Sequence, residues 1–401
     1  MSLFTMHKTT LQGSFAYHPL CRSRPDSYHV GKDFSLTSGH GPSTTATPGE
    51  FFGGKDMTQR TLRSEAAMRH RILVAACLAL LVMPLCAAAA TASVHPLASE
   101  LLHFLGFKPG DRGAVLEKGG VLQSGLTAGE HFPEEVAAVG AMLLVNAVDA
   151  NAVIDAFLHV DTFHRVHQVT RFEVLGADTA NAFATFRFSS AGEVERIRRD
   201  PLKILNLSAS EATSFRSGGS GSADSISQAM AQVLAKRLGG FISAGIAGIE
   251  PYQRAKRDPV RPDRELESAL RSLALLADDY PGFLDHLRQG GPMERGSRSY
   301  FRLDAPFQGV EAVALSSEVR QQFPDRAIGA DLHFYASQGY NSMLTLVGVV
   351  PYDQRWLVFA INHTFTDEVL GFASGMKRSV ARKEIAARLA KHLETVRGKV
   401  K

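Results

Sequence analysis

Residues 330–362, ADLHFYASQGYNSMLTLVGVVPYDQRWLVFAIN, decide the fold, because three β-rich runs follow one another closely there. The runs are Ala330–Ser337, Ser342–Val350 and Trp356–Asn362, and turn-like spots at 338–339 and 352–353 separate them. Two similar runs, Tyr300–Leu303 and Val310–Val319, come before them. Since short connections join antiparallel neighbours, this part of the chain predicts an antiparallel meander.

A long helix is predicted directly after the meander, from Met376 to about Arg397. Its apolar positions recur at helical spacing and are Val380, Ile385, Leu389, Leu393 and Val396. Such a stripe indicates a helix that lies across the sheet. The predicted fold class is therefore α+β, with an antiparallel sheet and a long C-terminal amphipathic helix packed across it.

The segment before the meander contains both strands and helices. A strand is predicted at 136–148, a helix capped by Asp149 at 150–159, and a strand pair at 168–175 and 182–188. Helical patterns fill 206–292, which we interpret as a helical insert. It includes a capping box at Ser208 and Glu211, a helix from Ala223 that Gly239-Gly240 would end, and helices at 262–277 and 281–288.

A different region precedes this domain. Met68 to Ala92 has the order of a secretory signal: basic residues at the start, an apolar run, and small residues with an Ala-Thr-Ala cleavage site before Ser93. The prediction is a periplasmic or secreted protein, and the alternative is a retained anchor in the inner membrane, because about 20 apolar residues span a bilayer. Residues 1–67 show no helical or strand periodicity, which predicts a disordered or untranslated leader, with translation from Met57 or Met68.

Charge and cysteine content divide the chain at the same place. Nine of the 44 Lys+Arg and five of the 40 Asp+Glu precede Ser93, so 35 of each remain after it. A formally neutral remainder gives no reason to expect nucleic acid as a partner. Residues 93–401 also lack cysteine, which excludes disulfides and thiol chemistry there and suits an oxidising compartment. The length of residues 93–401 fits a single α+β domain that includes the helical insert.

The order of elements at 136–190 and 298–398 resembles the START-type helix-grip fold, in which the closing helix packs in a curved sheet. The strand at 335–337 and the stretch GFASGMKR, 371–378, also resemble exported proteobacterial proteins of unassigned function. This resemblance implies a cavity that binds a lipid or another small apolar ligand without catalysis.

Polar side chains on the predicted meander are candidates for ligand contacts. In a cavity under the sheet, a few polar groups would orient one end of an apolar ligand. The candidates are Tyr335, Ser337, Tyr340, Asn341 and His363. The alternative is that these groups point to solvent at alternate strand positions.

Histidines close to the first helix form the densest potential metal cluster. They are His159, His164 and His167, and Asp155 and Asp161 lie beside them. Asp155 and His159 are one helical turn apart, so both could contact one zinc ion, as a periplasmic metal-dependent hydrolase would require. The alternative is that they are ordinary surface residues. After Ser93, neither serine-hydrolase pattern, G-x-S-x-G or S-x-x-K, appears in a convincing context. The glycine-rich stretch 217–222 lacks the GK[ST] end of a phosphate loop, and no cofactor is predicted.

The end of the chain is basic, since 377–401 holds nine Lys+Arg and two Asp+Glu. Basic residues near a helix C-terminus complement the helix dipole, and Glu384 with Arg388 makes an i,i+4 pair. A second interpretation is contact with an anionic membrane surface. The leading functional prediction is an exported binding protein for a lipid or other apolar ligand, and a third reading is an envelope-associated interaction domain.

Overall fold

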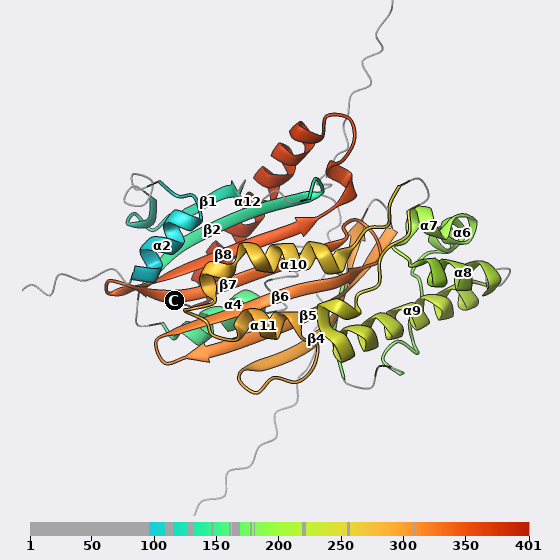
Figure 1. Cartoon of the computed structure of the whole chain (residues 1–401), viewed down its shortest axis with the longest axis horizontal. Helices are drawn as coiled ribbons and strands as arrows, with labels where there is room; N and C mark the ends of the chain where they lie inside the picture. The colour runs from blue at the N-terminus through green and yellow to red at the C-terminus, as the bar shows by residue number, and fades with distance from the viewer. Residues whose placement is uncertain are drawn as a thin grey trace, which may run out of the picture. The chain divides into compact units, whose positions relative to one another are not determined.

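Eight strands of the described residues form one antiparallel sheet in the order β1-β2-β8-β7-β6-β5-β4-β3 (Figure 1). They are β1 (Val121–Leu126), β2 (Glu135–Val145), β3 (Arg171–Leu175), β4 (Ser297–Phe307), β5 (Val310–Phe323), β6 (Arg326–Ala336), β7 (Ser342–Tyr352) and β8 (Arg355–Phe365). The computed structural model describes residues 96–400, except 109–114, 127–131, 146–147, 160–161, 163–168, 177–178, 180, 219–221, 255–256 and 308–309. The predicted leader and signal segments thus lie outside the described residues.

The predicted meander is confirmed, because β4 to β8 pair with one another in chain order. Two long-range pairings extend it on both sides. β2 pairs with β8, with Gly140 opposite Ala360, and β3 pairs with β4, with Val174 opposite Phe301. Both strand-forming parts of the sequence therefore belong to a single sheet, and the α+β class is confirmed.

One face of the sheet is covered by α4 (Ala150–Leu158) and α12 (Ser374–Lys399). The predicted closing helix thus lies on the sheet, where Leu389, Leu393 and Val396 are buried. The packing is close. A Cβ atom added at Gly140 would lie 2.8 Å from the Leu393 side chain, so the missing side chain in β2 makes room for α12.

The other face carries the remaining helices, which form the larger apolar core. α10 contacts β6 and β7, α11 contacts β5 and α2 contacts β7, and Figure 1 shows α10 and α11 in front of the sheet. These helices are α2 (Pro96–Phe104), α6 (Ala191–Arg199), α7 (Pro201–Ile204), α8 (Ala209–Gly218), α9 (Ala223–Ala244), α10 (Pro262–Ser272) and α11 (Phe283–Arg288). Short 3-10 helices are η3 (Gly245–Gly248), η4 (Ala274–Leu276) and η5 (Asp367–Val369). The insert predicted at 206–292 is thus helical, and its capping box forms: Ser208 N donates to Glu211 Oε2 at 2.6 Å, and Glu211 N donates to Ser208 Oγ at 3.3 Å.

Three predictions about single elements are wrong. Residues 182–188 form a turn and an irregular segment instead of a strand, because Phe183 and Phe186, three residues apart, are both buried in the core. Gly239-Gly240 does not end α9. Gly240 instead allows close approach of η3, since a Cβ atom at Gly240 would lie 3.0 Å from the Gly248 carbonyl oxygen. Finally, Val380 does not belong to the buried apolar face of the closing helix, because it is 59% exposed and α12 has no buried residue before Ala386.

In the part of the chain that the structure describes, no helix combines the length and the apolar character needed to cross a membrane.

Candidate functional site

A hollow of about 310 Å³ opens where the β6–β7 turn meets α7 and the loop after residue 252. Its wall combines apolar side chains with charged and amide groups. The lining residues are Arg196, Leu202, Lys203, Ile204, Leu205, Asn206, Arg254, Arg257, Phe307, Gln338, Gly339, Tyr340, Asn341, Asp367 and Glu368. Its size is that of a site for a small ligand.

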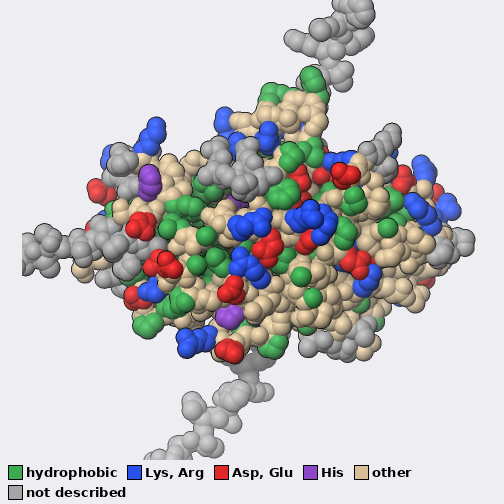
Figure 2. Space-filling view, in the orientation of Figure 1, with side chains coloured by type: hydrophobic (Ala, Val, Ile, Leu, Met, Phe, Trp, Pro, Cys, Tyr) green, Lys and Arg blue, Asp and Glu red, His purple; other side chains and the backbone are tan. Residues whose placement is uncertain are grey.

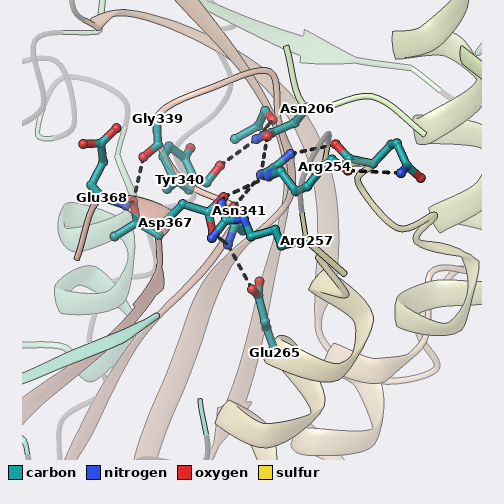
Figure 3. A network of polar contacts seen from close by, with 12 residues as sticks. Asn206, Arg254, Arg257, Glu265, Gly339, Tyr340, Asn341, Asp367 and Glu368 are labelled. Atoms are coloured by element: carbon teal, nitrogen blue, oxygen red, sulfur yellow. Dashed lines mark hydrogen bonds and ion pairs between the residues drawn. The ribbon is translucent and has the colours of Figure 1, made fainter. Parts of the chain in front are cut away.

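Arg254 is held in this wall by side chains from three separate segments (Figure 3). Its Nη2 donates to Asn206 Oδ1 at 2.8 Å and to Asn341 Oδ1 at 3.2 Å, and its Nε donates to Asp367 Oδ2 at 2.9 Å. Asn206 is fixed in turn, since its Nδ2 donates to the carbonyl oxygens of Ala336 and Tyr340 at 2.9 and 3.0 Å. The guanidinium is therefore oriented before any ligand arrives.

The hollow has an excess of positive charge. Four basic side chains and two carboxylates line it, so the formal charge of the wall is +2. Arg254 and Arg257 both contact the single carboxylate of Asp367. Lys203 is exposed, and no contact with an acidic side chain is seen for it among the described residues. Two guanidiniums that share one carboxylate retain the capacity to bind a further anion.

A buried carboxyl group lies behind this wall. Glu265 of α10 is fully buried, and Ser342 Oγ and Asn341 Nδ2 contact its two oxygens at 2.7 and 3.1 Å. Burial raises the pKa of Glu265 to about 8, although the hydrogen bonds from Ser342 and Asn341 act in the opposite direction. At neutral pH the Glu265 side chain is therefore mostly protonated and leaves the positive charge of the hollow uncompensated.

Of the five predicted ligand contacts, Tyr340 and Asn341 line the hollow. Ser337 and Tyr335 lie close by in sequence but do not line it. Ser337 Oγ accepts a hydrogen bond from Val313 N at 2.8 Å, and the Tyr335 ring packs edge-on against Tyr252. The alternative that these side chains alternate toward solvent is wrong for Tyr335, Ser337, Asn341 and His363, which are at most 1% exposed. The reason is that helices cover both faces of the sheet.

His363 lies in a separate buried cluster beneath α10. Its Nδ1 is 2.8 Å from Glu135 Oε1, and its Nε2 is 3.4 Å from Ser272 Oγ. Ser272, His363 and Glu135 are arranged like the nucleophile, base and acid of a catalytic triad. The Ser272 hydroxyl, however, donates its hydrogen bond to the Ala269 carbonyl oxygen at 2.7 Å. Since His363 is also closed off from solvent, the cluster joins the end of α10 to β2 and β8.

The predicted metal cluster is only partly within the described residues, because His164, His167 and Asp161 lie outside them. His159 follows the end of α4 and is exposed, while the Asp155 carboxylate contacts Arg320 in β5. Within the described ranges, no three His, Cys, Asp or Glu side chains are placed to hold a metal ion. Zinc binding by the full set stays a prediction.

No protein-family model, curated protein or solved structure matches this chain. The fold and the site define it on their own: an α+β protein with a positively charged hollow at one end of its sheet.

Sequence reasoning missed most of this site. Asn206, Arg254 and Asp367 come from segments that are far apart in sequence. Side-chain hydrogen bonds join them, and the backbone bond from Gln253 N to the Leu207 carbonyl oxygen also holds two of these segments together. One signal was present, the basic residues that interrupt the helical insert after Tyr252.

Proposed function

We propose that this protein is a non-catalytic binding protein for a small amphipathic anion, such as a lipid-like carboxylate or phosphate. The supporting observation is the combination in one hollow of an oriented arginine pair with apolar side chains. Arg254 and Arg257 would bind the anionic group, and Leu202, Ile204 and Phe307 would contact the apolar chain. This proposal narrows the lipid-like ligand expected from the sequence, and it gives that ligand a charged end.

The packing of α12 on the sheet also supports a ligand position in the hollow. In a helix-grip arrangement the ligand would lie between the closing helix and the sheet. Here Leu389 and Leu393 fill that space against β2, and no α12 residue lines the hollow. We therefore place the ligand at the end of the sheet, beside the β6–β7 turn, where Tyr340 and Asn341 lie.

Calorimetric titration of the full chain with octanoate tests the proposal. Octanol supplies the apolar chain without charge and acetate supplies charge without the chain, so octanoate should bind more tightly than both. Arg257→Gln should weaken octanoate binding about tenfold, because a hydrogen bond to a charged group contributes about 1.5 kcal/mol or more. Arg199→Gln is the matched control, since Arg199 pairs with Glu195 and does not line the hollow. Equal affinities for octanoate in these two variants would refute the proposed site.

Export remains part of the proposal and rests on the signal-like stretch at 68–92. N-terminal mass spectrometry of the protein from its native source should give Ser93 as the first residue. A peptide from residues before 57 would contradict the late translation start.

A further inference from the structure

The first half of α12 projects beyond the sheet (Figure 1), and it reaches β1 at Arg382, whose side chain packs against Gly125. No residue from 371 to 385 is buried, whereas Ala386, Leu389 and Leu393 pack into the core. The segment before the helix is held in place, because Lys377 Nζ donates to the Leu370 carbonyl oxygen at 3.0 Å. The projecting end, defined as residues 371–385, is therefore a helical surface anchored at its far end by the buried half of α12.

Large apolar side chains are exposed on this projecting end. Phe372 is 96% exposed, Met376 67% and Val380 59%. Their spacing of four residues places Met376 and Val380 on one side of the helix, and Phe372 immediately precedes its first turn. Among the described residues only Val145 and Val174 are large hydrophobic side chains of comparable exposure, and they lie in different strands. Three such residues within nine positions indicate a surface that is covered by an apolar partner.

The charge around these side chains identifies the kind of partner. Residues 371–383 include Lys377, Arg378, Arg382 and Lys383 and no acidic residue, and the first carboxylate, Glu384, pairs with Arg388 at 2.5 Å. Figure 2 shows hydrophobic and basic side chains together on this part of the molecule, at the top of the view. Two copies that met through this surface would bring eight positive charges together, so the charge disfavours self-association. An apolar stripe flanked by Lys and Arg is instead the pattern of helices that lie in the interface of anionic bilayers.

We propose that the projecting end of α12 binds the surface of an anionic phospholipid membrane. Phe372, Met376 and Val380 would enter the boundary between headgroups and acyl chains, while Lys377 and Lys383 would meet the phosphate groups. This inference is independent of the ligand hollow, and either can fail without the other.

Co-sedimentation of the full chain with vesicles tests this inference. We expect binding to phosphatidylglycerol-containing vesicles at low salt, much weaker binding to phosphatidylcholine vesicles, and loss of binding at about 0.5 M salt, where charge attraction is screened. Phe372→Ser with Met376→Ser should weaken binding at least about tenfold, because it removes the apolar area that would be buried. Lys377→Gln with Lys383→Gln should weaken it on the order of tenfold or more, since each basic residue near an anionic surface contributes about fivefold.

The controls separate this surface from the rest of the chain. Val174→Ser replaces an equally exposed apolar residue on β3, and Lys391→Gln replaces an exposed lysine on the same helix, and both should bind as wild type does. All variants share residues 1–173, which include the signal-like stretch, so any binding by that stretch is equal in all of them. Unchanged binding by the Phe372/Met376 variant would overturn the inference. So would sedimentation velocity showing a dimer that this variant abolishes, since the apolar surface would then serve a second copy.

Discussion

Replacing Glu265 by glutamine should remove a specific pH dependence from the stability of the protein. Glu265 has an ordinary pKa of 4.5 in the unfolded chain, and burial raises it to about 8 in the folded protein. The folded state therefore holds this proton more strongly than the unfolded state. Its contribution to stability is complete below pH 4.5 and is lost as the pH rises through about 8.

The size of the loss follows from the two pKa values. Between about pH 6 and about pH 9, the free energy of unfolding should fall by about 3 kcal/mol through Glu265 alone. Glutamine is close in shape and does not titrate. Its oxygen can accept from Asn341 Nδ2, and its amide can donate to Ser342 Oγ, so both contacts of the buried carboxyl group are kept.

Urea unfolding followed by circular dichroism at both pH values gives the free energies. Burial also raises the pKa values of Glu193 and Glu318, each to about 7, and these groups lower the stability of wild type and variant alike as the pH rises. The difference between the two proteins therefore isolates Glu265. Glu267→Gln, at a half-buried position of the same helix, is the control and should follow the wild type. If Glu265→Gln loses as much stability as wild type over this range, Glu265 is not the protonated group that we infer.

Two further predictions concern buried polar contacts. Burial lowers the pKa of His392 to about 4, so the free energy of unfolding should fall by about 3 kcal/mol as the pH falls from 6.5 toward 4. The variant His392→Phe keeps an aromatic ring against Phe157 and should not show this loss when unfolding by urea is measured. An identical acid response of the two proteins would contradict this. Arg237→Met should lower the free energy of unfolding by about 3 to 5 kcal/mol, because it leaves the buried Glu211 carboxylate, 2.7 Å from Arg237 Nη2, without its partner. Adding Glu211→Gln should restore part of this loss. The control Arg198→Met, which breaks an exposed ion pair, should cause no measurable change. Equal stability of the Arg237→Met variant and the double variant would argue against the ion pair as the cause.

The sheet could be predicted because each strand carries its own signal. The runs from Ala330 to Asn362 are rich in β-branched and aromatic residues and are separated by turn residues, so local sequence is sufficient to place them. The closing helix was found by its periodicity in the same way. Local patterns failed where tertiary contacts change the meaning of a residue. Gly240 is typical of a helix end, yet it lies within α9 because another backbone approaches it.

The candidate site was predictable only in part, for a related reason. Tyr340 and Asn341 stand out as polar residues in a turn between apolar strands. Arg254 and Asp367 do not, because their ion pair joins positions 113 residues apart, and no spacing in the sequence marks it. Val380 shows the same limit: it continues the apolar stripe of the closing helix, but it is 59% exposed, and the buried part of the stripe begins only at Ala386.

The pairing of β2 with β8 also sets the order in which the protein can fold. β2 is almost entirely apolar, and its partner strand is synthesised more than 200 residues later, after the helical insert and the meander. Until Phe365 has been made, β2 has only β1 beside it and exposes an unpaired edge to other chains. We therefore expect that folding intermediates aggregate through β2, and that partners which hold the unfolded chain matter more for this protein than for one built from local hairpins.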